Sequence, residues 1–408
     1  MTTPLNRFLW GASTAAHQVE GGNVGNDIWL LENLPDRSGG FREPSGDAVD
    51  HYHRYVDDIG LLAGLGLNAY RFSVEWARIE PERGQVSQAA LDHYARMADA
   101  CLERGLVPLV TLHHFTSPLW LAQAGGWDEA EAADLFAAHA ERVAARLGDR
   151  IGAWMTFNEI NLSTLAYDLP DARRARRLEK LRAAAGRRIA ADRFSTFLTH
   201  GGRAPEVLAR AHSLSVQALR AQVRAPVGLT LALPDLQAEP GGEAHLARAQ
   251  AETQDRWLDI TGPDDFVGVQ TYTRELFGPE GRLPPPDGQA LTLTGWEVYP
   301  QALGHAVTRA WSRTGKPILV TENGIATDHD PLRIDYTRRA LEGLAQARGQ
   351  GAEVWGYLHW SALDNFEWMH GYGPTFGLIG VDRATQARQV RDSARWLGDV
   401  ARTHPDGP

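Results

Sequence analysis

AWMTFNE, residues 153–159, and PILVTEN, residues 317–323, are two short, mostly apolar runs rich in residues that favour β-strands. The first ends on Asn158 and Glu159, and the second on Glu322 and Asn323. A strand without apolar–polar alternation is typically buried on both faces, as in a parallel sheet covered by helices. The two runs therefore predict buried parallel strands that each end on a carboxylate.

Six further strand-like runs occur in the chain, and stretches with helical periodicity separate them. The eight runs are residues 8–13, 68–74, 107–114, 153–159, 227–233, 266–272, 317–323 and 354–360. One intervening stretch has Ser87 at an expected helix start and Gly105 at its end. Regular alternation predicts a parallel sheet, and eight units predict a single (β/α)8 barrel over residues 1–408, with loop insertions at its C-terminal face. An open doubly wound sheet is the alternative.

Polar and aromatic side chains gather at or just beyond the C-terminal ends of these runs. They are Gln18, Glu20, Arg71, His113, His114, Asn158, Glu159, Tyr272, Glu322 and Trp360. Barrel enzymes build their active sites at that face, and buried charges there would be costly without a use. Cleavage of a glycosidic bond needs two carboxylic groups, and Glu159 and Glu322 are candidates for this pair. The pattern therefore indicates sugar chemistry.

Composition narrows the class of protein further. The chain has 408 residues, of which 43% are hydrophobic and 23% charged, as in ordinary globular proteins. Its formal charge of -10 argues against a nucleic-acid or membrane-surface binder, and the single cysteine, Cys101, excludes an intrachain disulfide or a multi-cysteine metal site. Without a signal-peptide pattern or a long apolar run, we expect a cytoplasmic protein. The sequence carries no signal for an oligomeric state.

Six segments together resemble glycoside hydrolase family 1, the retaining β-glucosidase and β-galactosidase family. They are FLWGASTAAHQVEGG (8–22), YRFSVEWARIEP (70–81), TLHHFTSPLWL (111–121), WMTFNE (154–159), PILVTENG (317–324) and GYLHWSALDNFEWMHGYGPTFGLIGVD (356–382). The resemblance extends from residue 8 to residue 382, nearly the whole chain. It implies a β-glycosidase that works without a metal or organic cofactor.

The resemblance also implies roles for individual residues. Glu322 would be the nucleophile and Glu159 the general acid/base, with Arg71 and Tyr272 supporting the nucleophile. The positions expected to bind the sugar are Gln18, His114, Asn158, Trp360, Glu367 and Trp368. We expect repulsion from ionised Glu322 to help raise the pKa of Glu159, so that Glu159 is protonated before the reaction.

The expected substrate is a small, unphosphorylated β-O-glycoside. Relatives that act on 6-phosphosugars have other residues around Glu367 and Trp368, where a carboxylate would repel a phosphate. A β-glucoside is favoured, with β-galactosides and β-fucosides as alternatives. The chain departs from the family at Phe115, at Gln270, and at a basic segment, residues 171–193, which we interpret as a solvated helix or, alternatively, a lid or anion site. Gln270 stands where the family has a shorter asparagine and is expected to alter contacts around the catalytic groups.

Three other functions remain open from the sequence. A transglycosylase would use the same two carboxylates but pass the sugar to an acceptor other than water. A sugar-binding protein on the same fold would have no activity, because a fold does not guarantee a function. An unrelated barrel enzyme could use Glu159 and Glu322 for other chemistry, such as enolisation, but this leaves the sugar-contact motifs unexplained.

Overall fold

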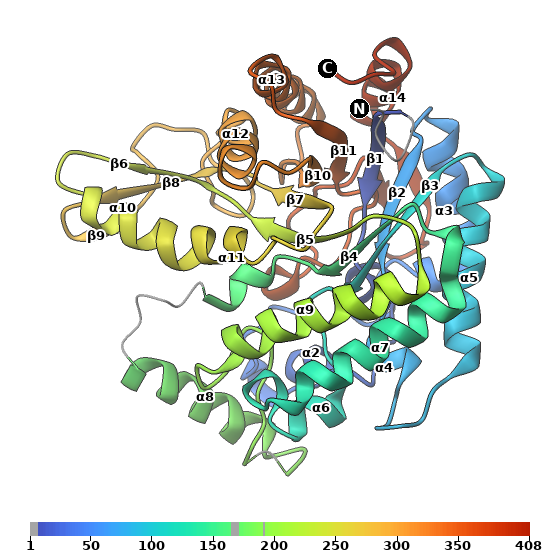
Figure 1. Ribbon diagram of the computed structural model, residues 1–408, viewed down its shortest axis with the longest axis vertical. Helices are drawn as coiled ribbons and strands as arrows, with labels where there is room; N and C mark the ends of the chain where they lie inside the picture. The colour runs from blue at the N-terminus through green and yellow to red at the C-terminus, as the bar shows by residue number, and fades with distance from the viewer. Residues whose placement is uncertain (1–6, 165–170, 191) are drawn as a thin grey trace.

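In the computed structural model, which describes residues 7–164, 171–190 and 192–408, eight parallel strands close into a barrel (Figure 1). They are β1 (Leu9–Ser13), β2 (Ala69–Ser73), β3 (Val107–His113), β4 (Ala153–Phe157), β5 (Val227–Ala232), β7 (Phe266–Gln270), β10 (Ile318–Asn323) and β11 (Val354–Trp360). The strands follow one another in chain order, and β11 closes the barrel against β1. Each of the eight expected runs forms one of these strands, and the open-sheet alternative is wrong.

Helices surround the barrel and complete a TIM-barrel fold (Figure 1). The longer helices are α3 (His51–Gly64), α5 (Gln88–Glu103), α7 (Glu131–Leu147), α8 (Asp171–Ala185), α9 (Ala204–Gln222), α10 (Glu243–Gln250), α12 (Ala302–Thr314), α13 (Asp330–Gly349) and α14 (Asp392–Thr403). Shorter ones are α1 (Ala16–Val19), α2 (Asp27–Glu32), α4 (Trp76–Ile79), α6 (Leu119–Gln123) and α11 (Arg256–Asp259). Helix α8 confirms the helical interpretation of the first part of the basic segment.

Helix α5 begins and ends where the sequence predicts. The Ser87 side chain accepts a hydrogen bond of 3.2 Å from the Ala90 backbone N–H, which satisfies one of the free donors of the first turn. Gly105 follows the helix with φ +75°, a left-handed conformation that glycine adopts without steric strain. Local capping chemistry therefore determines both ends of this helix.

Two small sheets lie outside the barrel and were not anticipated. One contains β6 (Asp235–Ala238), β8 (Arg274–Gly278) and β9 (Gly281–Leu283), and the other pairs β12 (Ile379–Val381) with β13 (Arg388–Val390). Strands of three to five residues with mixed polarity give too weak a period-two signal to be recognised in a single sequence.

The interior of the barrel changes from apolar to polar along the strands. Leu9, Ala69, Leu109, Ala153, Met155, Phe266, Leu319, Trp355 and Leu358 form one buried cluster. Two residues further along their strands, Arg71 follows Ala69 and Thr111 follows Leu109, on the same face because side chains alternate along a strand. The Arg71 Nε donates to Thr111 Oγ1 at 3.0 Å. The C-terminal end of the barrel is thus a polar layer above an apolar plug.

A register shift in β10 directs Glu322 into this polar layer. Val320 pairs with Val269, but Glu322, two residues on, pairs with Gln270, only one residue on. The extra residue, Thr321, makes a local bulge that changes which side chains face the interior. Glu322 therefore faces the same interior as Gln270 of β7.

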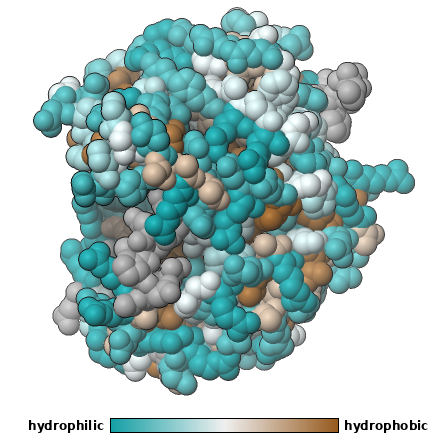
Figure 2. Space-filling model, turned by 60° about the vertical axis from the view of Figure 1, so that its left-hand side comes forward, coloured by the Kyte–Doolittle hydropathy of each residue, from teal (hydrophilic) through white to brown (hydrophobic). Residues whose placement is uncertain are grey.

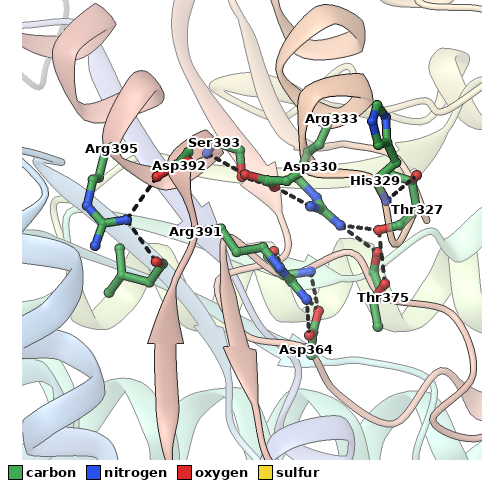
Figure 3. Close-up of polar contacts among 12 residues, drawn as sticks. Thr327, His329, Asp330, Arg333, Asp364, Thr375, Arg391, Asp392, Ser393 and Arg395 are labelled. Atoms are coloured by element: carbon green, nitrogen blue, oxygen red, sulfur yellow. Dashed lines mark hydrogen bonds and ion pairs between the residues drawn. The ribbon is translucent and has the colours of Figure 1, made fainter.

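A polar network ties the loops after β10 and β11 together (Figure 3). The buried Arg333 guanidinium on α13 donates to the carbonyls of Thr327 and Thr375 and pairs with Asp330. Asp330 accepts from the backbone and hydroxyl of Ser393 at the start of α14. Thr327 follows Glu322 by five residues, and Thr375 lies beyond Glu367 and Trp368. The network therefore anchors both segments that carry predicted site residues.

On the face turned forward in Figure 2, hydrophilic residues dominate and hydrophobic residues form small patches. Within the described residues, the helices are either too short or too polar to cross a membrane.

We expect Arg333→Met to lower the free energy of unfolding by about 2–4 kcal/mol, because it leaves the Thr327 and Thr375 carbonyls and Asp330 without the buried cation that binds them. Thermal and urea unfolding would measure this. The matched control is Arg338→Met on the same helix, where Arg338 pairs with Asp335 and Glu342 at the surface, and a change below about 1 kcal/mol is expected. Equal effects of the two substitutions would contradict an anchoring role for Arg333.

Candidate active site

The Glu322 carboxylate is held by three donors, one on β2 and two at or just beyond the C-terminal end of β7. Arg71 Nη1 donates to its Oε1 at 2.7 Å, and Gln270 Nε2 donates to the same oxygen at 3.0 Å. The Tyr272 hydroxyl donates to Oε2 at 2.5 Å. The Arg71 and Glu322 side chains are only 0% and 5% exposed, so the pair is almost fully removed from water. Such an arrangement favours the ionised carboxylate.

The neighbouring Asn158 amide is oriented by two of the same donors. Its Oδ1 accepts from Arg71 Nη2 at 2.5 Å and from Gln270 Nε2 at 2.8 Å. Its Nδ2 is buried and makes no hydrogen bond to the protein. Because buried donors are usually paired, this N–H group is available to a ligand.

Glu159 occupies a strained position immediately after Asn158. Its backbone has φ +42°, which is uncommon for a residue with a side chain, and its N–H donates to Thr230 Oγ1 at 3.1 Å. Strain of this kind concentrates at functional sites, where surrounding contacts maintain it.

The two glutamates differ in their affinity for a proton. Burial, followed by the charge of Glu322, raises the pKa of Glu159 well above its usual range, and the Arg71 guanidinium opposes this only in part. Burial also raises the pKa of Glu322, but Arg71, Tyr272 and Gln270 oppose the effect there. The proton therefore resides on Glu159. The sequence had suggested repulsion as a source of this shift, whereas burial is the larger cause.

A second cluster, formed by the segments after β1 and β11, surrounds Glu367. Trp360 Nε1 donates to Glu367 Oε1 at 3.3 Å, and Gln18 Nε2 lies 3.5 Å from Oε2. The Gln18 amide also donates to Asn365 Oδ1 and the Phe366 carbonyl, while its own Oε1 has no partner in the protein. Burial raises the pKa of Glu367 to about 8, so this carboxyl carries a proton at neutral pH and can donate as well as accept.

Aromatic rings form a wall beside this cluster. The His114 ring stacks 5.9 Å from Trp360 and 6.2 Å from Trp368, and Phe115 meets Trp368 edge-on at 5.3 Å. Burial, helped by Arg71, holds the pKa of His114 well below its usual range, so its ring is neutral. Phe115 and Trp368 both have left-handed backbones, at φ +69° and φ +51°. Neutral hydrogen-bonding groups beside flat rings suit a sugar.

Comparison with known proteins agrees with this geometry. Residues 2–169 and 286–405 match the pattern of glycosyl hydrolase family 1. Thermostable beta-glucosidase B of Thermobispora bispora is 35% identical, over 97% of this chain and 90% of its own length. The bifunctional beta-D-glucosidase/beta-D-fucosidase of Bifidobacterium breve is 33% identical, over 95% of this chain and 96% of its own. The crystal structure of beta-glycosidase BGL167 has a TM-score of 0.94 at 48% identity, covering 100% of this chain and 99% of that one.

This chain belongs to glycosyl hydrolase family 1. It is a retaining β-glycosidase, and members of this family act by double displacement through a covalent glycosyl-enzyme. The ten residues predicted for the site fall into two groups in the enzyme. Arg71, Asn158, Glu159, Tyr272 and Glu322 surround the carboxylate pair, and Gln18, His114, Trp360, Glu367 and Trp368 form the second cluster and its wall.

The neighbouring residues His113 and His114 of this glycosidase have different environments. His113 Nε2 lies 3.0 Å from the Ser117 hydroxyl, and its ring packs among Phe136, Phe157 and Trp127, whereas His114 belongs to the sugar-side wall. In the part of the chain that the structure describes, no three His, Cys, Asp or Glu side chains are grouped to hold a metal ion.

Sequence reasoning missed two residues and undervalued a third. Thr230 of β5 holds the Glu159 backbone, and Trp296, which is 39% exposed, places its ring 5.6 Å from that of Tyr272. Nothing local to either residue points to the site. Gln270 was expected to alter contacts around the catalytic groups, but its direct contacts with both Asn158 and Glu322 were not foreseen.

We expect Glu322→Gln to lower the pKa of Glu159, because the substitution removes a negative charge that favours the protonated form. The pKa should still lie above that of a free glutamate, since burial remains. A ¹³C NMR titration of δ-labelled glutamates, assigned with Glu159→Gln, would measure both values. Glu367→Gln is the control and should leave the Glu159 titration nearly unchanged. A Glu159 pKa that does not move in Glu322→Gln would contradict the coupling.

Proposed function

We propose that this enzyme hydrolyses unphosphorylated β-glucosides, with Glu322 as the nucleophile and Glu159 as the general acid/base. The contrast between the two carboxyl groups carries this assignment. Glu322 accepts hydrogen bonds from three donors that favour its ionised form, whereas no described residue hydrogen-bonds the carboxyl of the half-buried Glu159. An ionised carboxylate beside a protonated one is the starting state that a retaining mechanism needs.

The first step forms the glycosyl-enzyme. A Glu322 oxygen attacks the anomeric carbon while the bond from that carbon to the glycosidic oxygen breaks. The Glu159 proton moves to the departing oxygen, so the aglycone leaves as a neutral alcohol or phenol. The sugar is then an α-linked ester of Glu322, and Glu159 is a carboxylate.

The second step reverses these roles. Esterified Glu322 has no charge, so its part in raising the pKa of Glu159 is lost, and Glu159 gives up its proton more readily than before. Glu159 takes a proton from water as the water oxygen attacks the anomeric carbon and the ester bond breaks. The released sugar has the β configuration, Glu322 regains its charge, and Glu159 holds a proton again.

Six side chains are proposed to bind the sugar. They are Gln18, His114, Asn158, Trp360, Glu367 and Trp368. The unpaired Asn158 Nδ2 and Gln18 Oε1 provide one free donor and one free acceptor, and the stacked rings offer apolar surface to the sugar face. Asn158 would bind the 2-hydroxyl, where hydrogen bonds strengthen in the transition state.

An unphosphorylated substrate is favoured by the surroundings of Glu367. Its described partners, Trp360 and Gln18, are uncharged, so this corner lacks a cation for a phosphate. Burial raises the pKa of Glu367 to about 8, so this carboxyl repels a phosphate only weakly near neutral pH. The missing cation is therefore the main reason to expect an unphosphorylated sugar. The names of the relatives guide the choice of sugar: one is a beta-glucosidase, and another is both a beta-D-glucosidase and a beta-D-fucosidase. We therefore expect β-glucosides to be the first choice of substrate for this enzyme and β-fucosides the next.

Two further proposals concern the domain organisation and the cellular location of the enzyme. We propose that residues 1–408 act as one catalytic domain, which the closed barrel from β1 to β11 supports. A cytoplasmic location is also proposed, in keeping with a single buried cysteine, Cys101, and hence no disulfide within the chain.

We expect wild-type enzyme to release nitrophenol from aryl β-glucosides, with weaker release from β-galactosides and none from 6-phospho-β-glucosides. Glu322→Ala should lower kcat by at least about 10⁴-fold, because it removes the nucleophile. Added azide should restore turnover and give an α-glycosyl azide, identified by NMR. A wild type that hydrolyses no unphosphorylated glycoside would refute the proposal, and added alcohol acceptors would show whether transfer competes with hydrolysis.

We expect the remaining activity of Glu159→Ala to depend on the leaving group of the substrate. Glycosides of acidic phenols, which leave without a proton, should still form the glycosyl-enzyme, while those of alkyl alcohols should lose nearly all activity. Azide should here give a β-glycosyl azide, because it attacks the ester on Glu322 from the face that water normally uses. An α-azide from Glu159→Ala would reverse the roles assigned to the two glutamates.

A further inference from the structure

We propose that Gln270 is a positioning residue that locks the Glu322 carboxylate and the Asn158 amide together, and thereby aims the Asn158 N–H group at the sugar's 2-hydroxyl. The role in binding the sugar rests on the proposed function. The coupling of Glu322 to Asn158 through the buried Gln270 amide concerns the protein alone.

The first observation is the crowding of acceptors around one nitrogen. Gln270 Nε2 lies 2.8 Å from Asn158 Oδ1, 3.0 Å from Glu322 Oε1 and 3.4 Å from Thr230 Oγ1. An amide nitrogen has two hydrogens, so the two shorter contacts take both of them. Gln270 is fully buried, so no water competes for these hydrogens.

The second observation is that only one orientation of the amide is possible. Turning it over would place Gln270 Oε1 against the Glu322 carboxylate and the Asn158 carbonyl oxygen, which are acceptors themselves. The observed orientation leaves Oε1 buried without a partner. An unpaired buried acceptor costs about 1–3 kcal/mol, which is consistent with an amide held for its donor end.

Gln270 and Arg71 together determine the orientation of the Asn158 amide. Asn158 Oδ1 accepts from both Gln270 and Arg71, so its oxygen must face them and its Nδ2 must face away. Nδ2 is the atom left without a protein partner. Arg71 alone supplies one donor to this oxygen, and Gln270 supplies the second that prevents rotation of the amide.

Gln270 also belongs to the contacts that hold Glu159. Thr230 Oγ1, its third neighbour, accepts the Glu159 backbone N–H and donates to the Phe157 carbonyl. The strand register places Gln270 beside Glu322 on one side and Ala232 of β5 on the other. Strand β7 thus lies next to β10, which carries Glu322, and β5 separates it from β4, the strand that Glu159 follows.

Glutamine has the length that this double contact requires. Gln270→Asn keeps the donor but shortens the side chain by one methylene, so it should retain one of the two short contacts. Gln270→Leu removes the donor at nearly the same volume, and Gln270→Glu keeps the shape but puts an oxygen in place of the nitrogen. Gln346→Leu, on the exposed face of α13, is the matched control.

The decisive measurement compares an aryl β-glucoside with its 2-deoxy analogue. For Gln270→Leu we expect kcat/KM for the glucoside to fall about 100-fold, the range for loss of one oriented donor, and that for the 2-deoxy sugar to fall less than about 10-fold. Gln270→Asn should recover part of the loss, and Gln346→Leu should match wild type with both sugars. Equal losses with the two sugars would overturn the role through Asn158.

A second measurement needs no substrate. Gln270 donates to ionised Glu322 and so lowers the pKa of that carboxyl. The ¹³C titration of Glu322 should therefore move to higher pH in Gln270→Leu and Gln270→Glu, and the acidic limb of kcat/KM should move with it. An unchanged titration in folded Gln270→Glu would overturn the proposal. Because the titration does not depend on turnover, it separates failure of this inference from failure of the proposed β-glucosidase activity.

Discussion

The buried ion pair between Arg71 and Glu322 is the constraint on which the rest of the site depends. Two charges removed from water are tolerated only when nearly every donor and acceptor around them is used. Arg71 meets this condition by bonding to Thr111, Asn158 and Glu322, and Tyr272 and Gln270 complete the shell around the carboxylate. The ends of several strands are therefore held to one geometry by a single guanidinium.

The backbone adapts to this geometry rather than the reverse. A bulge at Thr321 directs Glu322 inward, and left-handed conformations at Glu159, Phe115 and Trp368 place side chains that an ideal strand or helix would not place. Such features persist only where the surroundings maintain them. The Arg333 network provides this support for the loops after β10 and β11.

Hydrogen-bond donors separate the roles of the two glutamates. Both lie in the same low-dielectric layer, yet Glu322 has three donors and Glu159 has none among the described residues, so one stays ionised and the other keeps its proton. Residues 170–285 lie between the two segments that match the family pattern. That region contains the basic helix α8 and Gln270, which stands where the family has asparagine, whereas both carboxyl groups lie in matched segments.

The sequence by itself determined the eight barrel strands, the caps of α5 and the two carboxylates, because strand burial, helix ends and motifs are written in residues close together in the chain. Only the tertiary structure decided the bulge at Thr321, the two outer sheets, the larger part that burial plays in the pKa of Glu159, and the contacts of Gln270. Gln270 lies 112 residues from Asn158 and 52 from Glu322. No local pattern encodes such contacts, because they exist only after the barrel has closed and brought the ends of its strands together.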